Sequence, residues 1–144
     1  MRHLIERVLE LSDDEVVPQF EPQPSGQGTD EELRALLESL QPRIRVYGVG
    51  GAGCNAVGRL DAEGLFENSF VTGYAINTDA QALLMSPLEH KVLIGRTARG
   101  RGAGGDPTKG EAAALESEMA LRGITTDTQL AIIAAGMGGG SGTG

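Results

Sequence analysis

From residue 44 to residue 144, short apolar runs alternate with longer stretches in which apolar positions recur at helical spacing. The apolar runs predict strands over residues 44–48, 70–76, 90–94 and 129–135. The helical spacing predicts helices near residues 54–64, 79–85 and 108–122. This alternation predicts an α/β fold of Rossmann-like type, with a mostly parallel sheet flanked by helices. Right-handed crossovers then bring the carboxyl end of every strand to one edge of the sheet.

The first 43 residues follow a different pattern, which predicts an acidic helical leader ahead of a domain over residues 44–144. Residues 1–43 hold ten acidic and four basic side chains, so most of the negative charge lies there. Apolar positions between Met1 and Leu11 recur at helical spacing. Residues 18–28 are rich in Pro, Gly and Gln, which predicts a flexible linker within the leader.

A second helix of the leader is predicted to begin at Thr29. The Thr29 hydroxyl and Glu32 have the spacing of a capping box, and Pro42 is expected to end the helix. Its apolar stripe consists of Leu33, Leu36, Leu37 and Leu40. A stripe of this kind favours packing on the edge of the domain over binding a dedicated partner.

Charge and composition narrow the classes of function. The net charge of −8 argues against a nucleic-acid binder and against binding to anionic membrane surfaces. The single cysteine, Cys54, excludes an intrachain disulfide and makes the cytosol the default compartment. The apolar run from Leu130 to Ala135 is too short to span a bilayer. We therefore predict a cytoplasmic protein with no direct membrane insertion and no nucleic-acid partner.

Three glycine-rich segments fall at the expected edge of the sheet. The first, Gly48-x-Gly50-x-x-Gly53, matches the dinucleotide-binding fingerprint in its strand-to-helix context. The second covers residues 99–107 and carries two arginines; it is either a mobile crossover loop or a loop whose amides meet a phosphate. The third covers residues 136–144, where bare amides and two hydroxyls can surround a nucleotide phosphate. No Walker A lysine accompanies them.

Polar residues at the end of the second strand leave two nucleotide types open. An NAD-binding module has an acid near this position to hold a ribose hydroxyl. Here Asn77 occupies the position, and Asp79 follows it as a candidate helix N-cap or Mg²⁺ ligand. Cys54 is interpreted as a packing residue, because His3 and His90 lie elsewhere in the predicted fold and neither is an obvious base for a thiol.

Four motifs together resemble the tubulin/FtsZ family of GTPases. Residues 138–144, Gly-Gly-Gly-Ser-Gly-Thr-Gly, look like the family signature loop GGG[ST]G[ST]G. Residues 50–55, 75–83 and 102–107 are similar to the first three nucleotide loops of FtsZ, in the same order and spacing. The acidic leader looks more like that of archaeal than of bacterial FtsZ proteins.

The resemblance implies a filament-forming cell-division protein that binds GTP or GDP with Mg²⁺. Residues 51–55 would contact the guanosine and phosphate region, residues 103–105 would face the terminal phosphate, and residues 140–144 would cradle the phosphates. Asp79 would reach Mg²⁺ through water. The implied nucleotide site consists of Gly50, Gly51, Ala52, Gly53, Cys54, Asn55, Asn77, Asp79, Ala103, Gly104, Gly105, Gly138, Gly139, Gly140, Ser141, Gly142, Thr143 and Gly144.

The same resemblance implies that residues 44–144 form an incomplete, N-terminal half of the GTPase domain, ending in mid-loop. In the family, later residues hold the base and complete the active site of the next subunit, so no catalytic residue is expected within this chain, which alone would be inactive. The unbroken apolar run from Leu130 to Ala135 is typical of a strand covered on both faces, and a covering helix would follow it.

The partners implied for the parent protein are further copies in a longitudinal polymer and other division proteins, at the division site in the cytoplasm. Two alternatives stay open at this point. One is a Rossmann-type NAD-binding module. The other is a half-domain that regulates filament assembly without hydrolysing nucleotide.

Overall fold

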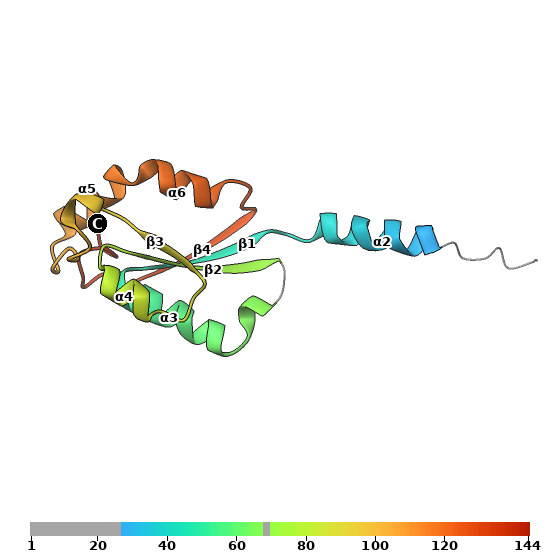
Figure 1. The fold of residues 1–144 in the computed structure, drawn as a ribbon, viewed down its shortest axis with the longest axis horizontal. Helices are drawn as coiled ribbons and strands as arrows, with labels where there is room; N and C mark the ends of the chain where they lie inside the picture. Colours follow the sequence, from blue (N-terminus) through green and yellow to red (C-terminus); the bar gives the residue numbers. More distant parts are fainter. Residues whose placement is uncertain (1–26, 68–69) are drawn as a thin grey trace, which may run out of the picture. The chain divides into compact units, whose positions relative to one another are not determined.

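A four-stranded parallel sheet organises residues 41–144 (Figure 1). The computed structural model describes residues 27–67 and 70–144. In chain order the strands are β1 (Ile44–Val49), β2 (Val71–Asn77), β3 (His90–Leu93) and β4 (Leu130–Ala135). Their order in the sheet is β3-β2-β1-β4, and all three neighbouring pairs are parallel. The predicted fold class is confirmed.

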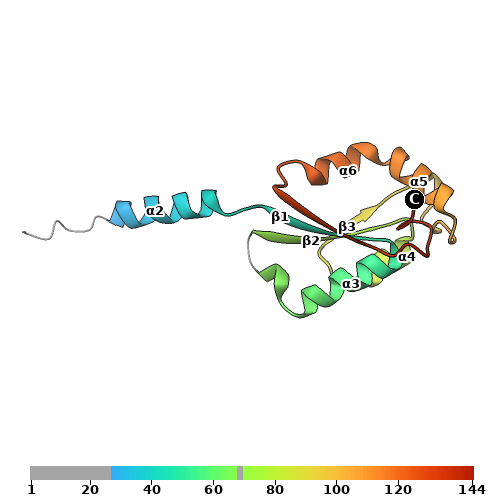
Figure 2. The ribbon, with the colours of Figure 1, turned by 180° about the vertical axis from the view of Figure 1, so that it is seen from behind.

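Helices cover both faces of this sheet. The chain adds α3 (Gly50–Ala62), α4 (Ala80–Met85), α5 (Pro107–Glu116) and α6 (Glu118–Thr125), with 3-10 turns η1 (Leu65–Glu67) and η2 (Arg96–Ala98). Figures 1 and 2 show α3 and α4 on one face and α6 on the other, with α5 near the carboxyl ends of the strands. Each strand therefore returns to the sheet through a crossover, as parallel pairing requires.

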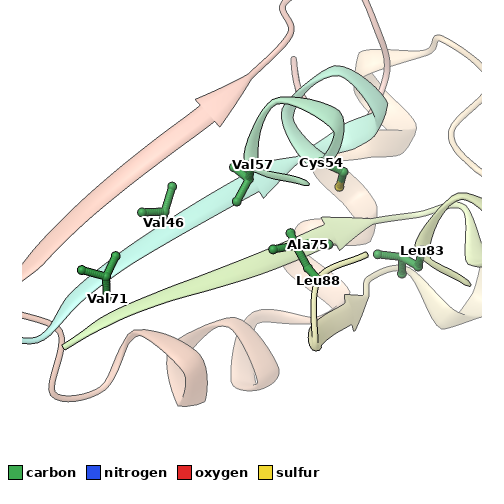
Figure 3. Close-up of a cluster of buried hydrophobic side chains, with 7 residues drawn as sticks. All are labelled: Val46, Cys54, Val57, Val71, Ala75, Leu83 and Leu88. Atoms are coloured by element: carbon green, nitrogen blue, oxygen red, sulfur yellow. The ribbon is translucent and has the colours of Figure 1, made fainter. Parts of the chain in front are cut away.

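Side-chain alternation along the strands builds a core on each face. Val46 of β1 belongs to the cluster under α3 and α4, and its neighbour Tyr47 belongs to the cluster under α5 and α6. Figure 3 shows the first cluster: Val46, Cys54, Val57, Val71, Ala75, Leu83 and Leu88. The second cluster consists of Tyr47, Ile76, Ile94 and Ala113.

β4 lies at the outer edge of the sheet in the described part of the chain. Leu130 is 50% exposed, Ile132 48% and Ile133 69%. The cover on both faces that the apolar pattern predicts is therefore not complete among the described residues. Exposed apolar side chains on an edge strand favour association with other polypeptide segments.

Two predicted boundaries are wrong, both for local reasons. α3 begins at Gly50, directly after β1, so residues 50–55 form the first helical turns instead of a loop. The predicted helix over residues 108–122 is two helices that separate at Ser117. There the backbone leaves the helical region (φ −102°, ψ 14°), and the Ser117 hydroxyl accepts a hydrogen bond from the Gly95 N–H at 2.9 Å.

The helix α2 (Gln27–Leu40) belongs to a separate compact unit and is described by itself. Thr29 lies inside this helix, so the predicted start at Thr29 is wrong, and the helix ends before Pro42 as predicted. Gln27 and Gly28, assigned to the linker, are helical. The predicted helix over residues 1–11 and the rest of the linker lie outside the described residues, and the division at residue 43 stays a prediction.

The Cys54 thiol provides a test of this core. Burial raises the pKa of the Cys54 thiol above its ordinary value, and backbone hydrogen bonds at Ile76 and Cys54 offset only part of that rise. The unfolded chain then loses the thiol proton at lower pH than the folded chain, so the thiol's contribution to stability is complete at neutral pH and declines above about pH 8.5.

We therefore expect the free energy of unfolding to fall more steeply between pH 8 and 10 in the natural chain than in a Cys54→Ala variant. Urea unfolding at several pH values measures both slopes, because the variant keeps every other titrating group. Parallel slopes would show that the thiol is not buried in solution.

Candidate functional site

Four chain segments meet at the carboxyl edge of the sheet, as the topology predicts. They are the first turn of α3, residues 77–79 after β2, residues 99–106 before α5, and residues 136–144 after β4. In Figures 1 and 2 they gather at one end of the sheet. The level register causes this meeting: Val49 of β1 lies opposite both Ile76 of β2 and Ala135 of β4.

A single buried side chain, Thr78, connects three of these segments. Its hydroxyl oxygen accepts a hydrogen bond from the Ala103 N–H at 2.9 Å and lies 2.6 Å from the Ser141 hydroxyl oxygen. Its carbonyl accepts from the Gly102 N–H at 3.1 Å. Thr78 is only 2% exposed. This role of Thr78 was not predicted from the sequence, although its hydroxyl lies between two polar candidate residues, Asn77 and Asp79, at the end of a strand.

Asn77 and Asp79 flank Thr78 and have different surroundings. Asn77 is buried, and its side-chain oxygen accepts from the Asp79 N–H at 3.3 Å and from the Ser141 hydroxyl at 3.4 Å. One oxygen of the Asp79 carboxylate accepts from the N–H groups of Gln81 at 2.9 Å and Ala82 at 3.1 Å. The predicted N-cap role of Asp79 is confirmed, and neither bond uses its second oxygen, Oδ2.

Several glycines at this edge are required by backbone packing. A Cβ on Gly48 would lie 2.6 Å from the Gly53 carbonyl oxygen, and one on Gly53 would overlap the carbonyl oxygen of Ala134 in β4. α3 therefore packs directly against the backbone of β1 and β4. The predicted site residues Gly53 and Cys54 are buried beneath the edge, where the Cys54 thiol donates to the Gly48 carbonyl at 3.3 Å.

The 136–144 loop is seated on α5 and on the strand ends by similar contacts. A Cβ on Gly140 would lie 2.5 Å from the Ala103 Cβ, and one on Gly142 would lie 2.8 Å from the Gly136 carbonyl oxygen. Gly144 rests against the start of α5, where its N–H donates to the Gly140 carbonyl at 3.0 Å. These contacts fix the course of the loop without a large side chain.

Other glycines at the same edge face open space. No atom beyond the chain neighbours lies within 4 Å of the position of a Cβ at Gly51, Gly104, Gly105, Gly138 and Gly139. Gly104 and Gly105 have left-handed backbones, with φ of 60° and 79°, which favours glycine at both positions. The edge thus presents bare backbone from three segments, an arrangement suited to close approach of an anion.

The remaining predicted residues divide between the interior and the surface. Gly50 is buried, and its Cβ position lies 3.1 Å from the Gly142 nitrogen, so the α3 turn and the 136–144 loop touch there. The exposed residues are Ala52, Asn55 and Thr143. The structure therefore brings the predicted set together at one edge, with exposed and buried members.

The charges and dipoles at this edge of the sheet come from the backbone and from a few side chains. Asp106 caps α5 by accepting from the Thr108 N–H at 3.0 Å, and Pro107 occupies the first turn. The amino end of this ten-residue helix lies beside the 99–106 loop. No group of three or more His, Cys, Asp or Glu that could hold a metal occurs among residues 27–67 and 70–144. A divalent ion here would need ligand oxygens besides those of Asp79.

Comparison with known proteins shows the family of this chain. Residues 43–144 match the model of the Tubulin/FtsZ family, GTPase domain. The chain belongs to the tubulin/FtsZ family. Across its full length it is 42% identical to "Cell division protein FtsZ 1" of Pyrococcus horikoshii, and it covers 38% of that protein. Over 84% of its length it is 43% identical to "Cell division protein FtsZ 1" of Halobacterium salinarum, covering 30% of it.

Solved structures of the family share the fold. An empty FtsZ dimer from M. jannaschii superposes with a TM-score of 0.71 and 43% identity, over 81% of this chain and 33% of that one. CetZ2 from Haloferax volcanii, a GTPgS-bound protofilament, gives a TM-score of 0.59 and 29% identity, over 71% of this chain and 33% of that one. The predicted resemblance to FtsZ is confirmed, and the chain spans about a third of the length of these relatives.

Among the described residues, no helix combines the length and the apolar character needed to cross a membrane.

Two glycines of the 136–144 loop form a matched pair for testing the packing in this family member. Gly142→Ala forces a Cβ against the Gly136 carbonyl, whereas Gly138→Ala places one in open space. We expect Gly142→Ala to lower the free energy of unfolding by about 1–3 kcal/mol, the usual cost of overpacking. Gly138→Ala should change it by no more than about 0.5 kcal/mol, as at an ordinary surface site. Equal effects in urea unfolding would refute the seating of the loop.

Proposed function

We propose that this chain forms the phosphate-binding half of an FtsZ-type GTP site. The observation that carries the proposal is the Thr78 hydroxyl, which ties the 99–106 and 136–144 loops to the end of β2. Both loops consequently present open glycine backbone at the same edge. A nucleotide triphosphate is an extended anion, which several converging loops hold better than one.

The roles proposed for the residues follow their placement. The open amides of Gly104, Gly105, Gly138 and Gly139 meet phosphate oxygens, and the Ser141 and Thr143 hydroxyls donate to them. At the start of α3, between Gly51 and Asn55, the exposed residues Gly51, Ala52 and Asn55 meet the guanosine and phosphate region. The buried Gly53 and Cys54 act from beneath, by letting α3 approach the strands.

Magnesium fits the site through Asp79. One carboxylate oxygen holds the start of α4, and the other is left for a hydrated cation, which prefers one or two carboxylates together with water and phosphate oxygens. A bound Mg²⁺ would offset the charge of the phosphates. The role of Asp79 itself is to accept two hydrogen bonds from backbone amides through one oxygen, which leaves its second oxygen for the cation.

Hydrolysis is proposed for the assembled protein of this type, and no catalytic residue is assigned within this chain. Hydrolysis of a phosphoanhydride depends on positioning the attacking water. This chain covers only about a third of the length of the FtsZ relatives, and the solved neighbours are a dimer and a protofilament. We propose that a second copy completes the site, and that the parent protein acts in division-ring assembly at the cytoplasmic division site with other division proteins.

The NAD-binding alternative accounts for less of the structure. It uses the turn from Gly48 to Gly53 and gives the 136–144 loop no role. The bonds of Thr78 to Ala103 and Ser141 make that loop part of the same edge, which favours a ligand gripped from several sides.

Nucleotide selectivity tests the proposal directly. We expect the purified 144-residue chain to bind GTP and GDP at least about tenfold more tightly than NAD, and to show no steady phosphate release. Asp79→Asn keeps a capping oxygen and removes the charge. It should therefore reduce the gain in GTP affinity that Mg²⁺ provides, while changing the affinity for GDP without Mg²⁺ much less.

Calorimetric titration with the three ligands, with and without Mg²⁺, measures this selectivity. Preferential binding of NAD would overturn the proposal in favour of a dinucleotide module. Nucleotide-independent binding to FtsZ filaments, with no GTP binding, would favour the regulatory half-domain.

A further inference from the structure

The hydrogen bonds around the Thr78 hydroxyl can be oriented in an order that gives every donor an acceptor. We propose that Thr78 is a positioning residue that leaves the Ser141 hydroxyl proton free for the nucleotide phosphate; this rests on the proposed GTP site. Thr78 is buried and acts through its neighbours. Three hydrogen bonds carry the inference: Ala103 to Thr78 and Ser141 to Asn77 have a fixed direction, and the direction between Thr78 and Ser141 follows from them.

The direction follows from the chemistry of the donors. The Ala103 N–H can only donate, so the Thr78 oxygen accepts at 2.9 Å. The proton of Thr78 then needs an acceptor, which the Ser141 oxygen provides at 2.6 Å. The Ser141 hydroxyl is then a donor, and its hydrogen bond goes to the Asn77 side-chain oxygen at 3.4 Å. No buried side-chain nitrogen or oxygen of the described residues lacks a hydrogen-bond partner, which agrees with this order.

The hydrogen bond from Ser141 to Asn77 is the weakest of the three. At 3.4 Å, the contact of Ser141 with Asn77 is well beyond the usual O–H···O distance of about 2.7–2.8 Å, whereas the Thr78 contact is short. The Asn77 oxygen also accepts from the Asp79 N–H, so it keeps a partner when the proton turns away. A phosphate oxygen is charged and accepts more strongly than an amide. Ser141 can therefore exchange acceptors while Thr78 holds its oxygen in place.

Removal of the Thr78 hydroxyl would disturb two loops at once. The Ala103 amide would lose its acceptor, and Ala103 is itself buried at 6% exposure. The Ser141 hydroxyl would lose the donor that fixes its orientation, and it could rotate to form a different hydrogen bond. Both effects weaken phosphate binding, because a buried unpaired amide destabilises the 99–106 loop and a misdirected Ser141 hydroxyl donates less well to the phosphate.

The test compares Thr78→Val with Thr78→Ser in GDP titrations of the full chain. Valine keeps the shape and removes the hydroxyl; serine keeps the hydroxyl and removes a methyl group. We expect Thr78→Val to weaken GDP binding about tenfold to a hundredfold and Thr78→Ser by less than about threefold. Thr72→Val makes the same change at the other end of β2 and should leave GDP affinity unchanged.

A double variant separates positioning from general support of the fold. In a Ser141→Ala background, Thr78→Val should weaken GDP binding at least about threefold less than in the natural chain, because one of its two routes to the phosphate is already absent. Equal losses in both backgrounds would overturn the positioning role. Equal GDP affinity of Thr78→Val and the natural chain would overturn it too.

Two further outcomes are distinct. Failure of the natural chain to bind GDP at all would refute the proposed GTP site and this inference with it. If Thr78→Val does not fold, Thr78→Cys replaces it, since a thiol has similar volume and forms only weak hydrogen bonds. The same loss of GDP affinity is then expected, and its absence contradicts the inference.

Discussion

Direct backbone contact between α3 and the carboxyl ends of β1 and β4 is the constraint on which the rest of this structure depends. Gly48 and Gly53 leave no room for a side chain between helix and strands. Helix α3 therefore begins immediately after β1, and the ends of β1, β2 and β4 lie level. The loops that follow the strands then emerge at one edge, where the Thr78 hydroxyl can reach two of them.

The 22 glycines of this chain consequently serve different purposes. Some, such as Gly53 and Gly142, permit close packing of backbone against backbone. Others, such as Gly105 and Gly138, have open space where a side chain would stand. A motif written only as glycines does not distinguish the two groups, and their separation depends on three-dimensional neighbours. We therefore expect substitutions in the first group to act mainly on packing, and substitutions in the second group to act on the approach of a ligand.

The sequence was sufficient to predict the parallel sheet, its strands and the edge where the glycine segments meet. Apolar runs and crossovers depend on local pattern and handedness, so they can be read without a structure. The start of α3 at Gly50 could not, because glycine-rich turns are poor helix formers and only tertiary packing stabilises this one. The break at Ser117 depends on the distant amide of Gly95, and the role of Thr78 depends on partners 25 and 63 residues away.

The most direct test of a phosphate site shared by converging loops is residue-resolved amide NMR of the 144-residue chain during titration with GDP. The account predicts that the largest shifts, and new protection from hydrogen exchange, occur together at amides of residues 51–52, 103–105 and 138–144. Amides of α6 and of the outer half of β4 should change little. Shifts confined to residues 48–53, with the 136–144 loop unaffected at saturation, would contradict the account.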